Sequence, residues 1–295
     1  TNGQKIDFSA KSVVLASGGY GANRAMLPKK VASYLFYGLD SETGDGLAMG
    51  KKIGAGTINL DLVKQYPQGV ETLPHHALAA TASSTDTMKK SGAIYVNRDG
   101  KRIVDELAGL GTLTKITEAQ KDSIMFIVMD KAAWKQYVAK SLEDKLVAAP
   151  SDLDKWAKIV NNGYPVMATS AKLADAAKTM GINAKGLQAT IDRWNGFVKA
   201  GADKDFGRKV LMPFGEGLYY IVEQKPRFQT TLGGLKANAD MQILNKKGQP
   251  IGNLFGAGCV VGGANGSDSL TAMMNSWAII SGVVAGDSAV KNLKK

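Results

Sequence analysis

The 295-residue sequence contains a single cysteine, Cys259, and only two histidines, His75 and His76. One cysteine cannot form an internal disulfide, and it excludes a structural zinc site built on several thiolates. The two histidines follow Pro74 on a predicted surface loop, and no cysteine or acidic residue stands at metal-site spacing from them. We therefore predict no bound metal ion.

Long apolar runs are also missing. No stretch of about 18 apolar residues occurs, so the sequence predicts no membrane span. Apolar residues make up 44% of the chain and charged residues 21%, which is typical of a soluble globular protein. No signal-peptide pattern is present. The sequence is thus that of a soluble domain of the cytoplasm or of the cell surface, and it does not identify the compartment.

The net charge of +11 comes from lysines that are scattered along the chain. They form no basic stripe with interleaved aromatic residues, so we expect no nucleic-acid partner. The positive field instead favours solubility and the attraction of small anions.

Glycine is abundant near the end of the chain. A strand-like run at Leu254 and Phe255 enters a turn with glycines at 256, 258, 262, 263 and 266, and a predicted helix follows that ends near Gly286. The free N–H groups and the positive dipole end of such a helix face whatever lies beyond the turn. The pattern indicates a site for an electron-rich ligand, although a glycine-rich turn alone is more often a simple loop.

Two further segments flank this turn in the predicted fold. Residues 5–20 indicate a hairpin whose second strand, residues 12–16, is continuously apolar and therefore buried on both faces. A helix is expected to start within residues 41–56, with Asp45 accepting hydrogen bonds from its first turn. Its predicted apolar side consists of Leu47, Met49 and Ile53.

The middle of the chain alternates short strands and helices. A hairpin is predicted with strands at 93–96 and 102–104 around the turn Asn97-Arg-Asp-Gly100. A strand at 123–129 and helices near 150–160 and 170–180 follow. A strand-like run opens at Tyr219-Tyr220, and a turn at residues 245–248 closes a second hairpin.

In this order the motifs resemble the fumarate reductase and succinate dehydrogenase flavoprotein family, especially its soluble branch of fumarate, urocanate and other enoate reductases and 3-ketosteroid dehydrogenases. The resemblance covers the whole chain. The motifs that carry it are Ala10-Lys-Ser-Val-Val-Leu-Ala-Ser-Gly-Gly-Tyr20, Thr43-Gly-Asp-Gly46, Gly92-Ala-Ile-Tyr-Val-Asn97, Asp203-Lys-Asp-Phe-Gly-Arg208 and Gly256-Ala-Gly258.

The resemblance implies an α/β fold. Residues 1–60 and 219–295 would form an incomplete, Rossmann-like FAD-binding domain, and residues 61–218 an inserted α+β capping domain. The family's G-x-G-x-x-G turn, which holds the FAD pyrophosphate, normally precedes the strand at 12–16 by more than a hundred residues. No such turn occurs here. We therefore interpret the chain as a fragment whose missing N-terminal segment is its partner. We expect FAD in the full-length parent, and we do not expect this chain alone to bind FAD tightly.

The resemblance also implies which residues hold FAD. They are Ser17, Gly18, Gly19, Asp45, Gly233, Gly258, Cys259, Ser269, Leu270 and Thr271. Cys259 stands where the family usually has an acidic residue that holds the ribityl chain.

The substrate positions depart from the family. There, one arginine donates a proton, and another arginine with two histidines holds the carboxylates of the substrate. Here the proton-donor position carries Leu110, and the carboxylate-binding positions carry Ser269, Thr230 and Tyr66. Neutral hydroxyls suit a less charged substrate than a dicarboxylate, because burying a dianion without matched cations is costly. A tyrosine could serve as the proton donor, as the ketosteroid branch suggests.

A proton relay of the family corresponds to Asp86 and Lys89, an acid and a base three residues apart. The alternative is a solvated ion pair that contributes under about 1 kcal/mol. The candidate catalytic residues are thus Tyr66, Thr230, Ser269, Asp86 and Lys89.

Two functions remain open at this point. The first is a flavin-dependent oxidoreductase that transfers a hydride between flavin N5 and the double bond of an enoate or a related small molecule. The second is a non-catalytic fragment or degenerate homologue that acts only as a binding or capping module.

Overall fold

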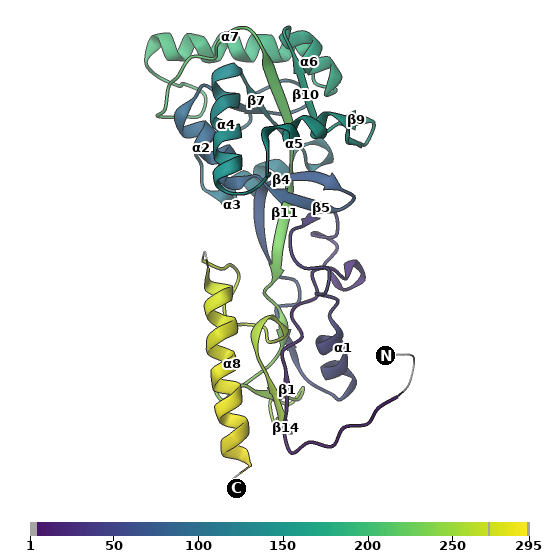
Figure 1. Ribbon diagram of the computed structural model, residues 1–295. Coiled ribbons are helices and arrows are strands. Elements are labelled where there is room, and N and C mark those ends of the chain that lie inside the picture. Colours follow the sequence, from purple (N-terminus) through teal and green to yellow (C-terminus); the bar gives the residue numbers. More distant parts are fainter. Residues whose placement is uncertain (1–4, 271, 294–295) are drawn as a thin grey trace. The chain divides into compact units, whose positions relative to one another are not determined.

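The computed structural model describes residues 5–270 and 272–293. The chain divides into two compact units. Unit 1 consists of Thr1–Ser33, Gly38–Lys64 and Phe228–Lys295, and unit 2 of Tyr34–Tyr37 and Gln65–Arg227. Their elements are labelled in Figure 1. The chain passes from one unit to the other after Ser33, Tyr37, Lys64 and Arg227.

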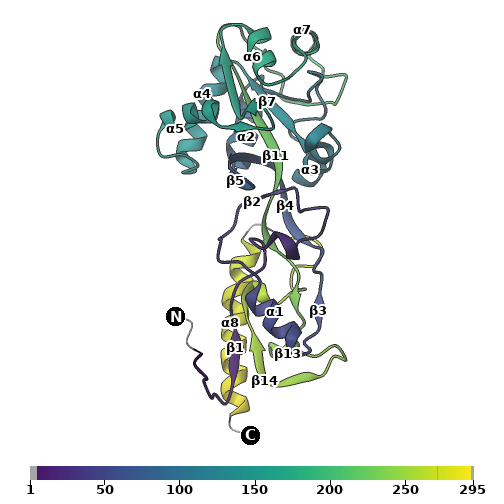
Figure 2. The same cartoon turned by 90° about the vertical axis from the view of Figure 1, so that its right-hand side faces the viewer.

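Unit 1 is built on a three-stranded sheet with the order β1-β14-β13. Strand β1 (Val13–Leu15) runs parallel to β14 (Pro250–Gly256), which pairs antiparallel with β13 (Gln242–Leu244). Helix α8 (Met273–Asn292) lies along β14 and β1 in both views (Figures 1 and 2). The side that faces the sheet is small and apolar, since Ala285 and Ala289 pack with Phe255 in one buried cluster.

Smaller elements complete unit 1. They are the 3-10 turns Arg24–Met26 and Gly258–Val260, helix α1 (Asp45–Lys52), and strands β3 (Thr57–Ile58) and β12 (Gly234–Leu235). Helix α1 packs through glycines: an added Cβ would lie 2.0 Å from Ser17 Oγ at Gly46 and 2.7 Å from the Leu235 side chain at Gly50. The turn after β1 is therefore held close to the first turn of α1.

Three predictions for unit 1 were wrong in detail. Residues 5–10 form no strand, and Val13 and Val14 of β1 are 47% and 41% exposed. Among the described residues β1 has a strand partner on one edge only, so it is an edge strand and is not covered on both faces as predicted. Helix α8 continues past Gly286 to Asn292, because packing of its small residues on the sheet outweighs the low helix propensity of glycine.

Helix α1 also differs from its prediction. Its N-cap is Gly44 with φ of 80°, and no side chain caps its first turn, so Asp45 does not accept the expected hydrogen bonds. The helix buries Gly46, Leu47 and Gly50. Met49 and Ile53 are exposed, because the helix packs through the face that carries Gly46 and Gly50.

Unit 2 is organised around a mixed sheet with the order β2-β5-β4-β11-β7-β6, and β10 also pairs with β11. Its strands are β2 (Leu35–Phe36), β4 (Val63–Leu73), β5 (His76–Ala79), β6 (Ile94–Val96), β7 (Met125–Met129), β10 (Met167–Ser170) and β11 (Tyr219–Thr231). Strands β4 and β11 begin or end in unit 1. The predicted hairpin of residues 93–104 is present in reduced form, with a single bridge between Val96 and Arg102.

Strand β7 explains why this sheet has helices on both faces. Successive strand side chains point to opposite faces. Met125, Ile127 and Met129 belong to a core formed with helices α2 (Thr81–Lys90) and α4 (Lys131–Glu143). Phe126 and Val128 belong to a second core, formed with α6 (Leu173–Thr179) and α7 (Ala184–Ala200).

The remaining elements of unit 2 are α3 (Leu110–Glu118), α5 (Pro150–Asp154), β8 (Val160–Asn161), β9 (Tyr164–Pro165) and the 3-10 turns Lys121–Ser123 and Lys155–Lys158. The alternation of strands and helices confirms the predicted α/β class. Within the described ranges, no helix combines the length and apolar content needed to cross a membrane. No group of three or more His, Cys, Asp or Glu side chains there is arranged to hold a metal ion.

Candidate functional site

The turn after β1 brings together four distant segments of unit 1. A Cβ atom at Gly19 would lie 2.4 Å from Thr231 Oγ1, 3.4 Å from Glu42 Oε2 and 3.7 Å from Cys259 Cβ. Glycine is therefore required at position 19. Its neighbour Gly18 has φ of 78°, a conformation that favours glycine as well.

Two polar atoms beside Gly19 have no partner. Glu42 Oε2 and Thr231 Oγ1 are buried without a hydrogen bond among the described residues. Burial raises the pKa of Glu42. Buried polar groups without partners are rare in folded proteins, and each one indicates strain, water or a ligand. A carboxylate and a hydroxyl at a glycine turn match a ligand that carries hydroxyl groups.

Cys259 lies at the same place. Its Sγ is 3.5 Å from Thr230 Oγ1. Burial raises the pKa of Cys259, so its thiol is neutral at physiological pH. The carboxylate of Glu42, which lies far away in the sequence, also raises the pKa of Cys259 and lies beside Gly19. Neither Glu42 nor Thr231 was predicted from the sequence, because their proximity to Gly19 appears only in the folded chain.

The glycine turn after β14 is held by side chains of α8. Gly258 N–H donates to Ser281 Oγ at 2.9 Å, and its carbonyl accepts from Trp277 Nε1 at 3.1 Å. Close backbone packing continues at Gly233, where a Cβ atom would lie 2.1 Å from the Asn59 carbonyl oxygen. Gly258 also has φ of 69°, a conformation that favours glycine, so both predicted glycines, Gly233 and Gly258, have a structural reason to be glycine.

The residues before α8 point elsewhere than expected. Ser269 is 6% exposed, and its hydroxyl donates to the Leu270 carbonyl at 3.0 Å. Leu270 is 76% exposed. Asp268 forms an ion pair with Lys64 at 2.6 Å. The predicted cofactor residue Thr271 lies outside the described residues.

Of the candidate catalytic residues, Thr230 and Ser269 lie in unit 1, and Tyr66, Asp86 and Lys89 lie in unit 2. Asp86 forms its ion pair with Lys90 at 2.9 Å rather than with Lys89, which is exposed. This is the solvated pair that was the alternative to a relay. A catalytic role for Asp86 and Lys89 stays a prediction.

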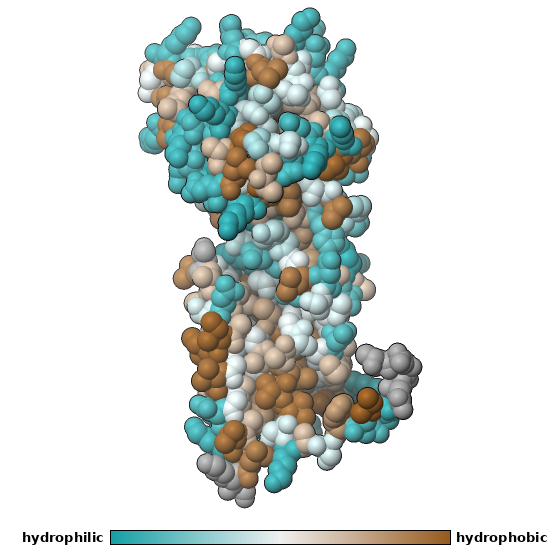
Figure 3. Space-filling view, in the orientation of Figure 1, coloured by the Kyte–Doolittle hydropathy of each residue, from teal (hydrophilic) through white to brown (hydrophobic). Residues whose placement is uncertain are grey.

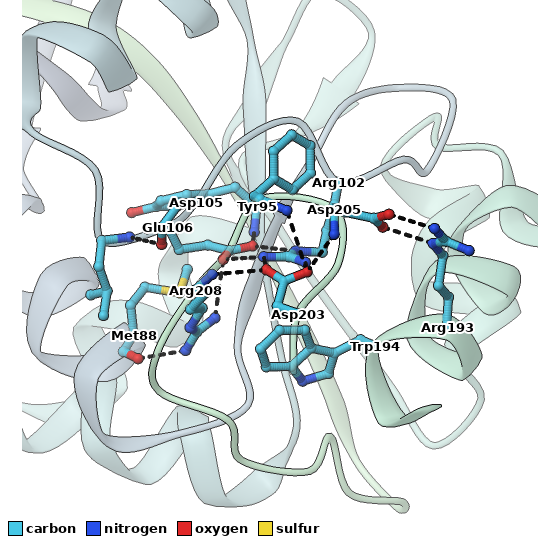
Figure 4. A network of polar contacts seen from close by, with 12 residues as sticks. Met88, Tyr95, Arg102, Asp105, Glu106, Arg193, Trp194, Asp203, Asp205 and Arg208 are labelled. Atoms are coloured by element: carbon cyan, nitrogen blue, oxygen red, sulfur yellow. Dashed lines mark hydrogen bonds and ion pairs between the residues drawn. The ribbon is translucent and has the colours of Figure 1, made fainter. Parts of the chain in front are cut away.

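Unit 2 contains a buried network of charges in which every carboxylate and guanidinium has a partner (Figure 4). Arg102 donates to Glu106 at 2.8 Å and to Asp203 at 3.1 Å, and Arg208 donates to Glu106 at 3.2 Å. The rings of Trp194 and Phe206 cover Arg102. Residues 203–208, which match a family motif, thus fix the fold of unit 2. A groove of about 420 Å³ lies beside Arg102, Arg193 and Asp205, and these three charged side chains are already paired.

A third residue that sequence reasoning missed is Arg227, at the end of the unit 2 part of β11. Its guanidinium carbon lies 4.2 Å from the ring centre of Tyr66. Tyr66 therefore contacts a cation and not only neutral hydroxyls. The sequence does show an arginine at the end of the run Lys225-Pro-Arg227. It does not show that this arginine is buried, so it did not predict a site there.

A parallel strand pair, a glycine turn after each strand and a helix along the sheet define unit 1 as part of an α/β nucleotide-cofactor domain. The chain belongs to the FAD binding domain family, which matches residues 1–273. FAD is therefore its cofactor, and the hydroxyl-binding groups beside Gly19 fit the ribityl or ribose part of that molecule.

Known relatives agree with this assignment. Urocanate reductase of Eggerthella lenta is 31% identical over 293 residues, which cover 97% of this chain and 46% of the relative. Fumarate reductase (cytochrome) of Shewanella frigidimarina is 31% identical over 290 residues, with 97% and 46% covered. The chain thus spans about half the length of the curated relatives it matches.

Solved structures show the same similarity. The open conformation of a flavocytochrome c3 fumarate reductase matches with a TM-score of 0.76 and 28% identity, covering 96% of this chain and 46% of that one. The 3-ketosteroid delta1-dehydrogenase from Sterolibacterium denitrificans matches with a TM-score of 0.75 at 20% identity, covering 98% and 55%, and supports the fold alone. The resemblance stated from the sequence is confirmed.

Proposed function

We propose that this chain is part of a flavin-dependent oxidoreductase, similar to fumarate and urocanate reductases, that acts on the double bond of a small enoate. The observation that carries the proposal is the unpartnered Glu42–Thr231 pair beside Gly19, in a chain of the FAD binding domain family. When bound, FAD supplies or accepts the hydride at N5. The residues of this chain bind and orient cofactor and substrate, and a tyrosine hydroxyl, with Tyr66 as the candidate, donates the proton to the second carbon of the double bond.

In this proposal Glu42 replaces the acidic residue that the family has at the position of Cys259. Its carboxylate accepts a hydrogen bond from a cofactor hydroxyl, and Thr231 makes a second hydrogen bond. Gly18 and Gly19 let the cofactor approach the backbone. The role of Asp45 is less direct, because its side chain is exposed and caps nothing.

The substrate pocket is altered from dicarboxylate binding. The hydroxyls of Thr230 and Ser269 both donate to backbone carbonyls, and neither side chain carries a charge. Leu110 offers no proton. A substrate with two carboxylates would leave charge unmatched at these positions, which favours a substrate of lower charge.

We also propose that a further segment of the same protein covers the exposed apolar side chains of unit 1. Val13 and Val14 of β1 are exposed, and so are Ile279, Ile280, Val283 and Val290 of α8, whose outer side is brown in Figure 3. The relatives are about twice as long as this chain, so such a segment has counterparts in them.

The proposed function is tested by flavin spectroscopy on the purified protein. We expect it to take up FAD, to lose the visible flavin absorption when reduced without oxygen, and to regain it when an enoate is added. A protein that stays colourless after incubation with FAD, or a reduced flavin that no enoate reoxidises, would favour the non-catalytic binding module instead.

A further inference from the structure

Arg227 is a buried cation with an incomplete set of partners. The residue is 4% exposed. Its Nε donates to the Gln68 carbonyl at 3.2 Å, and its Nη2 donates to Thr81 Oγ1 at 3.1 Å. Nη1 is buried and has no hydrogen-bond partner among the described residues.

The charge of Arg227 is unpaired as well. Three basic residues are buried in the described part of the chain: Arg208, Lys225 and Arg227. The first two contact carboxylates, with Lys225 bridging Glu71 and Glu223. No described carboxylate pairs with Arg227. Burial lowers the pKa of Arg227 to about 10, so the group remains charged at neutral pH.

Two tyrosines hold the guanidinium in place. Its carbon lies 4.2 Å from the ring centre of Tyr66 and 5.0 Å from that of Tyr37. Cation–π contacts stabilise the charge but supply no hydrogen-bond acceptor. Gly69 lets the strands approach here, since a Cβ atom on it would lie 3.0 Å from Arg227 Cβ. The site is thus ordered, positively charged and short of one acceptor.

An oxygen anion is the ligand that completes these interactions. Guanidinium is suited to carboxylate because of its planar array of donors, and a single guanidinium neutralises a single carboxylate. We propose that Arg227, held between Tyr37 and Tyr66, binds the carboxylate of a monoanionic enoate. The inference rests on the proposed function and narrows its substrate class. Arg227, the cation that binds the substrate in this proposal, was not among the substrate-binding residues predicted from the sequence.

The test compares three ligands that share a four-carbon trans-alkene: crotonate with one carboxylate, fumarate with two, and crotonamide with none. Binding to the oxidised protein is measured by flavin difference spectra and by thermal shift. We expect crotonate to bind more tightly than both others. In Arg227→Gln, crotonate affinity should fall about 10- to 100-fold, because a charged hydrogen bond is lost, while crotonamide affinity stays unchanged.

Two further variants separate charge from folding. Arg193→Gln removes an arginine that also stacks on an aromatic ring, Phe197, but is paired with Asp205 at the surface. It should leave crotonate affinity unchanged. Arg227→Lys keeps the charge and should retain part of the affinity. Equal crotonate binding by Arg227→Gln and the parent, or an equal loss of crotonate and crotonamide binding, would overturn the inference.

The inference and the proposed function fail separately. If crotonate reoxidises the reduced flavin equally well in the parent and in Arg227→Gln, the oxidoreductase stands and the Arg227 site does not. If crotonate binding depends on Arg227 but no enoate reoxidises the flavin, the anion site stands and the reductase does not.

Discussion

Two buried groups of charges in unit 2 differ in how completely they are paired. Around Glu106, each guanidinium meets a carboxylate and an aromatic ring, and the backbone carbonyls of Ala93 and Met88 accept from Arg208. Arg227 also has aromatic neighbours, but no acid. We call a network closed when each buried charge contacts an opposite charge, and open when one does not. A closed network stabilises the fold by itself, whereas an open one can bind a charged ligand.

The largest effect is expected from opening the closed network. Glu106→Ala leaves Arg208 and Arg102 buried with fewer acceptors and should destabilise the protein by about 3–5 kcal/mol. Urea unfolding measures this change. Asp205→Asn, at the exposed pair with Arg193, is the control and should cost under about 1 kcal/mol. Similar losses in both variants would refute the contrast.

Changing the Glu42–Thr231 pair of unit 1 should affect the affinity for FAD more than the stability of the fold. Glu42→Gln removes a charged acceptor and should weaken FAD binding by about 1.5–3 kcal/mol, tenfold or more. FAD titration followed by quenching of flavin fluorescence measures the affinity. Asp45→Asn is the matched control, since Asp45 was predicted from the sequence but is exposed. A greater loss in Asp45→Asn would restore the sequence-based assignment.

Glu42 also predicts a pH dependence in the absence of FAD. Because burial raises its pKa in the folded state, its contribution to stability is fully present at pH values below the usual glutamate pKa. That contribution is lost as the pH rises through the raised value. Glu42→Gln lacks this loss, so its melting temperature relative to the parent should be higher at neutral than at acidic pH. A constant difference across the pH series would contradict the burial of this carboxyl.

The smallest effect is expected at the exposed acid–base pair of α2. Lys89→Ala should change the free energy of unfolding by no more than about 0.5 kcal/mol, because Asp86 is paired with Lys90. Enoate-dependent flavin reoxidation should be unchanged in this variant. A large loss of rate at unchanged stability would support the proton relay that the family resemblance suggests.

The sequence predicted the features that follow from a local pattern of residues, such as an apolar run or a cluster of glycines. Strand β7 was recognisable because all of its residues are apolar and packed on both faces. The glycine turns were recognisable because backbone approaches such as that at Gly233 exclude any side chain. The same pattern failed for the strand at Val13, whose apolar run is not buried among the described residues.

The new site residues could not be predicted in this way. Arg227 differs from the other buried cations in having no described carboxylate beside it, and Glu42 has a buried oxygen without a partner next to Gly19. Both properties depend on every residue that folds around these side chains. Asp45 shows the converse error, since its position suggested a cap that a glycine N-cap makes unnecessary. Local patterns therefore predicted the scaffold, whereas the charges available to a ligand required coordinates.

The short strand β2 determines which residues are needed to express unit 2 on its own. Phe36 of β2 pairs with His76 of β5, although the rest of unit 2 begins only at Gln65. Expressing residues 65–227 as an isolated module would remove that strand and uncover a sheet edge, which invites pairing with other chains. Residues 34–37 should therefore be grafted back through a linker before such a module is used as a monomeric reagent.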